Sequence, residues 1–199
     1  EYIEFKPFGI KINRLISTLL NLMRYRKIDK INPSWVNTVA FLCQLRRGND
    51  LFNYLMKNEP EFTLKFETSR IDAKKRIQLF KTLFKKYTDR KIWIDRNKID
   101  YEEMANFGKT QEIYKYLMRY ARSKEHFTHR YNAIQMLGRM KGLENELLRN
   151  LLIEYAKDEN ENQNVRHISF YALSWLGMAT PDTIDALKHL KDSNDDWVL

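Results

Sequence analysis

One segment of the chain recurs 39 residues further along, and this repeat limits the possible folds more than any other feature of the sequence. Five positions recur at this offset: Arg130, Ala133, Ile134, Leu137 and Gly138 align with Ser169, Ala172, Leu173, Leu176 and Gly177. A weaker copy, which includes Met104, Phe107 and Gly108, lies upstream. Each copy reads as a helix, a glycine turn and a second helix. One such pair cannot bury its apolar face alone, so the copies are expected to stack.

Helical spacing of apolar residues continues through the rest of the chain, and only six glycines and four prolines interrupt it. These observations predict an all-α fold, because a many-stranded sandwich needs far more turn residues. An irregular helical part in residues 1–95 runs into helix-pair repeats in residues 96–199, which stop within a repeat. Helices are expected over residues 12–23, 32–48, 51–56 and 70–87, with a connector or short helix over 61–68.

Small residues mark two features of the repeat. A glycine follows the first helix of each copy, where a left-handed residue is favoured, so Gly108, Gly138 and Gly177 are predicted to be left-handed caps. Ala133 and Ala172 are expected to let the two helices of a pair approach closely.

The last copy resembles a HEAT repeat in a series of motif positions: Val165-Arg166, Ser169, Ala172-Leu173, Leu176-Gly177, Ala179-Thr180-Pro181, Leu187, Leu190 and Asp192. The resemblance covers residues 97–199 and is closest over 165–199, whereas the middle copy has His126-Phe127 in place of the Val-Arg pair. It implies an α-solenoid whose curved face binds proteins or, less often, nucleic acid. It also implies an ion pair between Arg166 and Asp192 or Asp195.

The N-terminal part, with Asn32-Pro33-Ser34-Trp35 opening an apolar helix, is similar to the linker before the sensor of NACHT-type STAND ATPases. This resemblance implies a parent ATPase acting as a sensor in antiviral defence. The sequence contains no Walker motif, so no ATP chemistry is assigned to these residues. Because the chain begins at Glu1 and ends within a repeat, we expect it to be a piece of a longer protein.

Positive charge is concentrated in the first half of the chain. Residues 1–100 carry a net charge of +11, residues 101–150 carry +3, and residues 151–199 carry −5. Four cations fall on one side of the helix expected over 70–87: Arg70, Lys74, Lys81 and Lys85. Trp93 lies in a basic stretch just after this helix. The cations are either a solvated border of the apolar face or a binding surface, and Trp93 is either a core residue or a stacking platform.

Catalytic motifs are missing from the sequence, and we expect no catalytic residue, cofactor or metal. His126 and His129 share one helical face beside Glu125, but no third ligand is visible. Cys43 lies among apolar neighbours, which favours an inert thiol. No apolar run is long enough to span a membrane, so a cytoplasmic location is expected.

Three functions remain open on these grounds. The first is a non-catalytic scaffold that binds a protein partner or the rest of its own parent chain. The second is a nucleic-acid-binding HEAT-like protein, similar to the alkyl-base DNA glycosylases, that uses a basic helical face. The third is a structural spacer.

Overall fold

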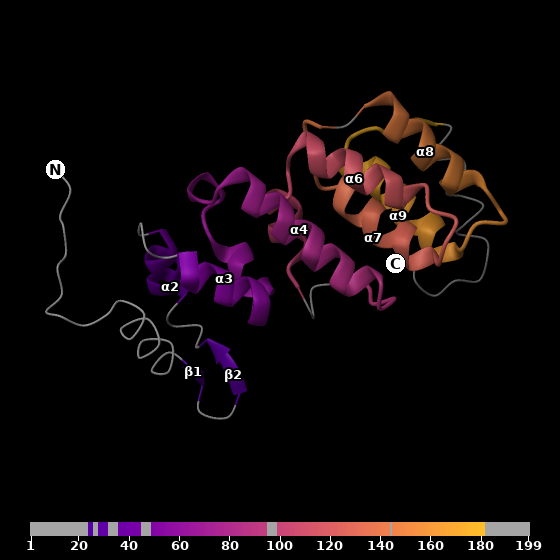
Figure 1. Cartoon of the computed structure of the whole chain (residues 1–199). Helices are drawn as coiled ribbons and strands as arrows, with labels where there is room; N and C mark the ends of the chain where they lie inside the picture. Colours follow the sequence, from indigo (N-terminus) through magenta and orange to yellow (C-terminus); the bar gives the residue numbers. More distant parts are fainter. Residues whose placement is uncertain are drawn as a thin grey trace, which may run out of the picture. The chain divides into compact units, whose positions relative to one another are not determined.

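The computed structural model describes six stretches of the chain: residues 24–25, 28–31, 36–44, 49–94, 99–143 and 145–181 (Figure 1). It divides into two compact units, Glu1–Asp72 and Ala73–Leu199. The boundary that we predicted between residues 95 and 96 marks where the repeat begins in the sequence, and it stays a prediction. The expected helix over residues 12–23, the Asn32-Pro33 cap and the second helix of the last repeat lie outside the described residues.

The first unit contains helices α2 (Val36–Gln44) and α3 (Asn49–Asn58), followed by the 3-10 helices Pro60–Lys65 and Thr68–Arg70. Helix α2 lies within the stretch predicted over 32–48, and α3 includes the stretch predicted over 51–56. The segment over 61–68, predicted as a connector or a short helix, is largely 3-10 helix. Apolar side chains of α2, α3 and Phe66 form the core. Cys43 packs against this core, and burial raises the pKa of its thiol to about 12, so the thiol is not a ready nucleophile.

A short antiparallel hairpin is the one departure from helical structure in the described part of the chain. Strand β1 (Arg24–Tyr25) pairs with strand β2 (Ile28–Ile31). The apolar pattern of the sequence predicts no strand here. The described part of the chain is otherwise all-α, which confirms the predicted fold class.

The second unit is built from six described α-helices: α4 (Ala73–Thr88), α5 (Tyr101–Phe107), α6 (Gln111–Ala121), α7 (Phe127–Leu137), α8 (Glu146–Lys157) and α9 (Gln163–Trp175). Five of them begin after a residue whose side chain accepts a hydrogen bond from a first-turn N–H group: Asp100, Thr110, His126, Asn145 and Asn162. Such caps satisfy donors that the helix leaves unpaired, and they explain where these helices start.

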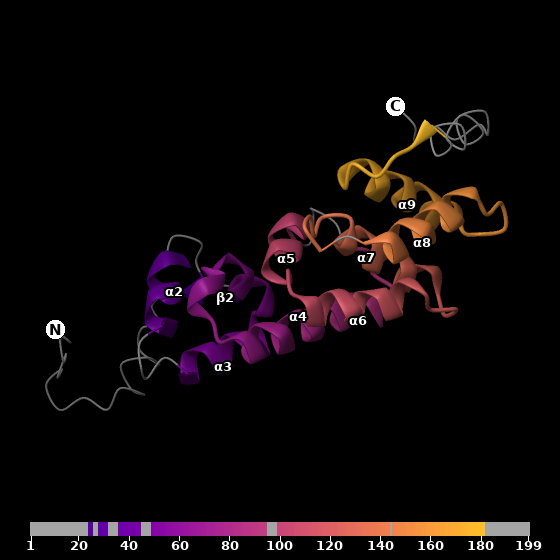
Figure 2. The same cartoon turned by 90° about the horizontal axis from the view of Figure 1, so that it is seen from above.

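Helix α7 lies at the centre of the second unit. It packs against α6 on one side and α9 on another, and α8 packs against α9 (Figure 2). Every residue from Asn132 to Leu137 is buried. A helix covered all round has no polar stripe, which is why α7 is far less amphipathic in sequence than α6.

Glycine plays two different roles in the repeats. Gly177 has a φ of +67°, which confirms the predicted left-handed cap. The same prediction is wrong for Gly108 and Gly138, whose φ values of −83° and −61° are right-handed. A Cβ on Gly138 would lie 2.8 Å from the Cβ of Ala172, so this glycine is needed for close approach of α7 and α9. Ala172 therefore lies at the contact between two successive first helices. The contact predicted within its own pair involves the second helix of the last repeat, which lies outside the described residues.

Candidate interaction surface on helices α4 and α6

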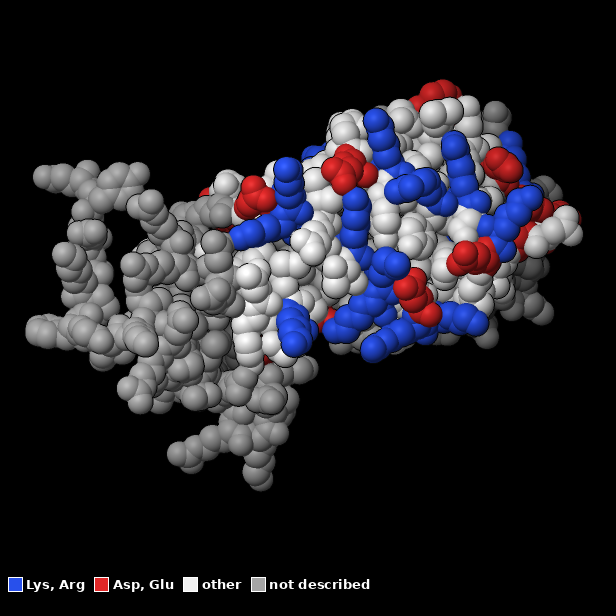
Figure 3. All heavy atoms as spheres, in the orientation of Figure 1, with Lys and Arg blue, Asp and Glu red and all other residues white. Residues whose placement is uncertain are grey.

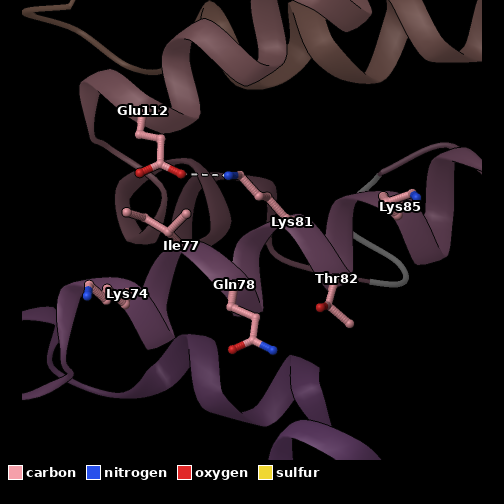
Figure 4. A pocket seen from close by; sticks show the side chains of 7 residues that line it. All are labelled: Lys74, Ile77, Gln78, Lys81, Thr82, Lys85 and Glu112. Carbon is pink, nitrogen blue, oxygen red and sulfur yellow. Dashed lines mark hydrogen bonds and ion pairs between the residues drawn. The ribbon is translucent and has the colours of Figure 1, made fainter.

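Three of the predicted basic residues line one groove. Lys74, Lys81 and Lys85 of α4 line a groove of about 380 Å³, whose other lining residues are Ile77, Gln78, Thr82 and Glu112 (Figure 4). Arg70 belongs to the 3-10 helix Thr68–Arg70 of the first unit, and its side chain lies outside the described part. The structure thus brings three of the four cations together.

The lysines follow the axis of α4. Lys74 and Lys81 are seven residues apart, and Lys85 follows four residues later. With a rise of about 1.5 Å per residue, these intervals correspond to about 10 Å and about 6 Å along the helix. Lys74 and Lys85 are exposed, and Lys81 is half-buried between them. The result is a row of positive charge along one edge of the groove.

Glu112, in the first turn of α6, is the only acidic residue among those that line the groove. Its Oε1 atom lies 2.6 Å from the Nζ atom of Lys81, and Figure 4 shows the two side chains pointing toward one another. The Lys81 Nζ atom also lies 5.5 Å from the ring centroid of Tyr116, a cation–π contact. Lys81 is therefore held from the α6 side by both a carboxylate and an aromatic face.

Helix α6 adds two cations to those predicted from the sequence. Arg119 is exposed, and its guanidinium carbon lies 5.8 Å from the centre of the same Tyr116 ring. Lys115 is exposed one turn earlier on α6. Figure 3 shows lysine and arginine side chains spread over this face, with fewer carboxylates between them. Helical spacing groups Lys115 and Arg119 on one side of α6, but only the packing of α6 against α4 joins them to the lysines. We call Lys74, Lys81, Lys85, Lys115 and Arg119 the basic face.

Trp93 lies outside this groove's lining. Its ring stacks on Tyr131, with centroids 4.7 Å apart and planes inclined by 24°, and it meets Phe127 edge-on. The indole is half-buried in these contacts. These contacts pack Trp93 against α7. A role for Trp93 in stacking on a ligand stays a prediction.

A second cleft, of about 300 Å³, is lined in part by Arg139 and Trp175. The Arg139 guanidinium carbon lies 4.0 Å from the ring centroid of Tyr101 and 3.6 Å from that of Trp175. The cation is thus sandwiched by aromatic rings from α5 and α9, and burial lowers its pKa from the ordinary value. Because arginine remains charged at neutral pH, this sandwich is a cation–π clamp that joins α5 and α9 to the turn after α7.

The histidine pair at the start of α7 has local structural roles. The Nδ1 atom of His126 accepts a hydrogen bond from the Thr128 N–H group and so caps the helix. Desolvation, aided by the nearby Lys91, lowers the pKa of His126, which favours the neutral form that the cap requires. His129 pairs instead with Glu125, with Nδ1 and Oε2 3.0 Å apart. Within the described stretches, no cluster of three or more His, Cys, Asp or Glu residues is arranged to hold a metal ion.

Helices α7 and α9 are the first helices of successive pairs, and they pack against one another through small residues. This is the arrangement of stacked helix pairs. Residues 114–199 match the family model of HEAT repeats. This HEAT-repeat segment begins inside α6 and includes the α7 to α9 contact and the contact of Arg139 with Trp175, whereas Tyr101 precedes it. The basic face spans its N-terminal border, because α4 precedes the segment and packs on α6 and α7. No curated protein and no solved structure matches the chain significantly. Among the described helices, none has the length and apolar character needed to cross a membrane.

Proposed function

We propose that the chain is a non-catalytic helical scaffold that binds an acidic protein partner through the groove between α4 and α6. The observation that carries this proposal is the row of Lys74, Lys81 and Lys85 with a carboxylate already bound in it. The HEAT-repeat segment supports the scaffold role, because stacked helix pairs present long, rigid surfaces to partners.

The lining of the groove favours a protein over a nucleic acid. Single-stranded nucleic acids are bound without sequence preference by combining cations with aromatic platforms for the bases. The groove has the cations, but no aromatic residue is among its lining residues. Tyr116, whose ring lies beside Lys81, is buried and already covered by Lys81 and Arg119.

The finer proposal concerns the parent protein. We propose that the scaffold is the linker and first sensor repeats of a cytoplasmic NACHT-type STAND ATPase in antiviral defence. Its support is the sequence similarity of the N-terminal part, including Asn32-Pro33-Ser34-Trp35. A Walker motif upstream of Glu1 in the parent gene is the expected finding, and a parent gene without one would remove this proposal.

Nucleic-acid binding is the second candidate, because residues 1–150 carry a net charge of +14 and the basic face has cations on both α4 and α6. A phosphate backbone would be attracted to the same lysines, and its binding would fall linearly with the logarithm of the salt concentration. The two candidates therefore require the same surface and differ in which probe binds more tightly.

A fluorescence anisotropy titration of the full chain tests the scaffold proposal against its alternative. The probes are a labelled oligoglutamate and a labelled oligothymidylate of equal charge. We expect oligoglutamate to bind more tightly, and the Lys74→Glu/Lys85→Glu variant to weaken it by about tenfold, because each reversal turns an attraction into a repulsion. The Lys124→Glu/Lys157→Glu variant carries the same charge change at exposed positions outside the groove and should have a smaller effect.

Tighter binding of oligothymidylate, with the same loss in the groove variant, would favour the nucleic-acid function. Equal losses in the two charge-reversal variants would show that net charge, and not this groove, determines binding. That result would contradict the proposed surface for either ligand.

A further inference from the structure

We propose that the groove receives an acidic amphipathic helix, and that Glu112 occupies the central lysine until a carboxylate of that helix displaces it. This inference rests on the proposed scaffold function and names both the form of the partner and a built-in competitor. It concerns the groove lined by Lys74, Lys81, Lys85, Ile77 and Glu112.

The spacing of the cations specifies a helical partner. Lys74, Lys81 and Lys85 are separated by seven and then four residues, so they lie on one side of α4. A second helix lying along the groove has the same rise and the same repeat, so carboxylates at these intervals would face all three lysines at once. An extended strand has a rise more than twice as large and would not keep this register.

The apolar part of the groove adds a second requirement. Ile77 is half-buried among the lysines and is the one branched aliphatic residue in the lining. A partner helix that is acidic on one face and carries an aliphatic residue between its carboxylates would cover Ile77. An entirely polar acidic chain would leave it in contact with water, so the partner is expected to be amphipathic.

Glu112 shows how a helix-borne carboxylate sits in this groove. It projects from α6 and reaches the Nζ atom of Lys81 at 2.6 Å (Figure 4). Its side chain is 58% exposed, and that of Lys81 is 32% exposed. Ion pairs between such exposed groups are weak, so an incoming carboxylate can replace Glu112 at little cost. Lys81 keeps its contact with the Tyr116 ring and remains directed into the groove when Glu112 leaves.

Two synthetic peptides of identical composition test the shape of the partner. In the first, three glutamates spaced by seven and then four residues share one face with a leucine between them. In the second, the same glutamates are placed five residues apart, which distributes them around the helix at about 140° intervals. Isothermal titration calorimetry of the full chain should give an affinity for the first peptide about tenfold higher than for the second. Equal affinities would overturn the helical partner.

The Glu112→Gln variant tests the competitor. It removes the internal carboxylate and should tighten binding of the first peptide about two- to fivefold, because the lost ion pair is a surface pair. Lys81→Gln should weaken binding of the same peptide. Glu154→Gln removes one negative charge on the exposed side of α8 and should leave the affinity unchanged. Circular dichroism of each variant checks that the helices are retained.

The outcomes separate this inference from the proposed function. If Glu112→Gln has no more effect than Glu154→Gln while Lys81→Gln weakens binding, the groove binds an acidic partner but Glu112 is not its competitor. If Lys81→Gln and the Lys74→Glu/Lys85→Glu variant leave both peptide affinities unchanged, the proposed surface itself is wrong. Tighter binding of oligothymidylate than of the first peptide would identify a nucleic acid as the ligand and overturn the helical partner.

Discussion

The Arg130→Met variant should be less stable than the original chain by about 3–5 kcal/mol, because it breaks a buried ion pair and leaves a carboxylate without its partner. Arg130 Nη2 donates to Glu161 Oε1 at 2.6 Å, and Nη1 donates to the Ser123 and Glu125 carbonyl oxygens. The guanidinium thus joins the loop between α6 and α7 to the loop between α8 and α9. Urea unfolding followed by circular dichroism measures the loss.

A second ion pair in the same unit provides the control. Arg149 and Glu146 lie 2.9 Å apart on α8, but their side chains are 32% and 69% exposed, compared with 14% and 9% for Arg130 and Glu161. Arg149→Met should therefore cost no more than about 1 kcal/mol. The Arg130→Met/Glu161→Leu double variant should be more stable than Arg130→Met alone, because no uncompensated charge remains. Similar losses for the two arginine variants would contradict the assigned role of the buried pair.

Replacing Asn132 by leucine should cost about 3–5 kcal/mol, because one fully buried amide satisfies three other polar groups. Its Nδ2 atom donates to Thr88 Oγ1 at 3.1 Å and to the Ile92 carbonyl oxygen at 2.9 Å. Its Oδ1 atom accepts from the Ile94 N–H group at 3.0 Å. Leucine has a similar volume but leaves all three groups unpaired next to α7.

The exposed Asn150 on α8 is the matched control, and Asn150→Leu should change stability by less than about 0.5 kcal/mol. A second readout is local: the Ile94 amide proton should exchange with solvent faster in Asn132→Leu, because its acceptor is gone. Unchanged protection of Ile94 together with unchanged stability would show that Asn132 does not hold the segment after α4 against α7.

The sequence predicted the helices well because their signals are local. Apolar spacing and caps identified the regions of α2, α3 and α4, and the 39-residue repeat identified the helix–glycine–helix units. The spacing could not specify contacts between helices. Position 132 aligns with Tyr171 in the repeat, yet Asn132 is buried and Tyr171 is 46% exposed. Which face of a repeat is covered depends on its neighbours, and for α7 these include α4 and the segment after it.

The same limit applies to the candidate site. Three lysines on α4 could be grouped from the helical period alone, because they belong to one element. Glu112 and Arg119 join them only through the packing of α6 against α4, which no local pattern encodes. The glycines show the same distinction, since Gly177 follows a local rule and Gly138 is required by contact with another helix.

Methyl NMR of the full chain tests the central proposal, that an acidic partner binds in the groove between α4 and α6, most directly. Ile77 lines the groove, whereas Ile153, which is half-buried on α8, does not. On titration with the peptide that carries glutamates on one face, we predict that the δ1 methyl resonance of Ile77 shifts and that of Ile153 stays in place. A shift of Ile153 without a shift of Ile77 at saturating peptide would place the binding surface elsewhere and contradict the proposal.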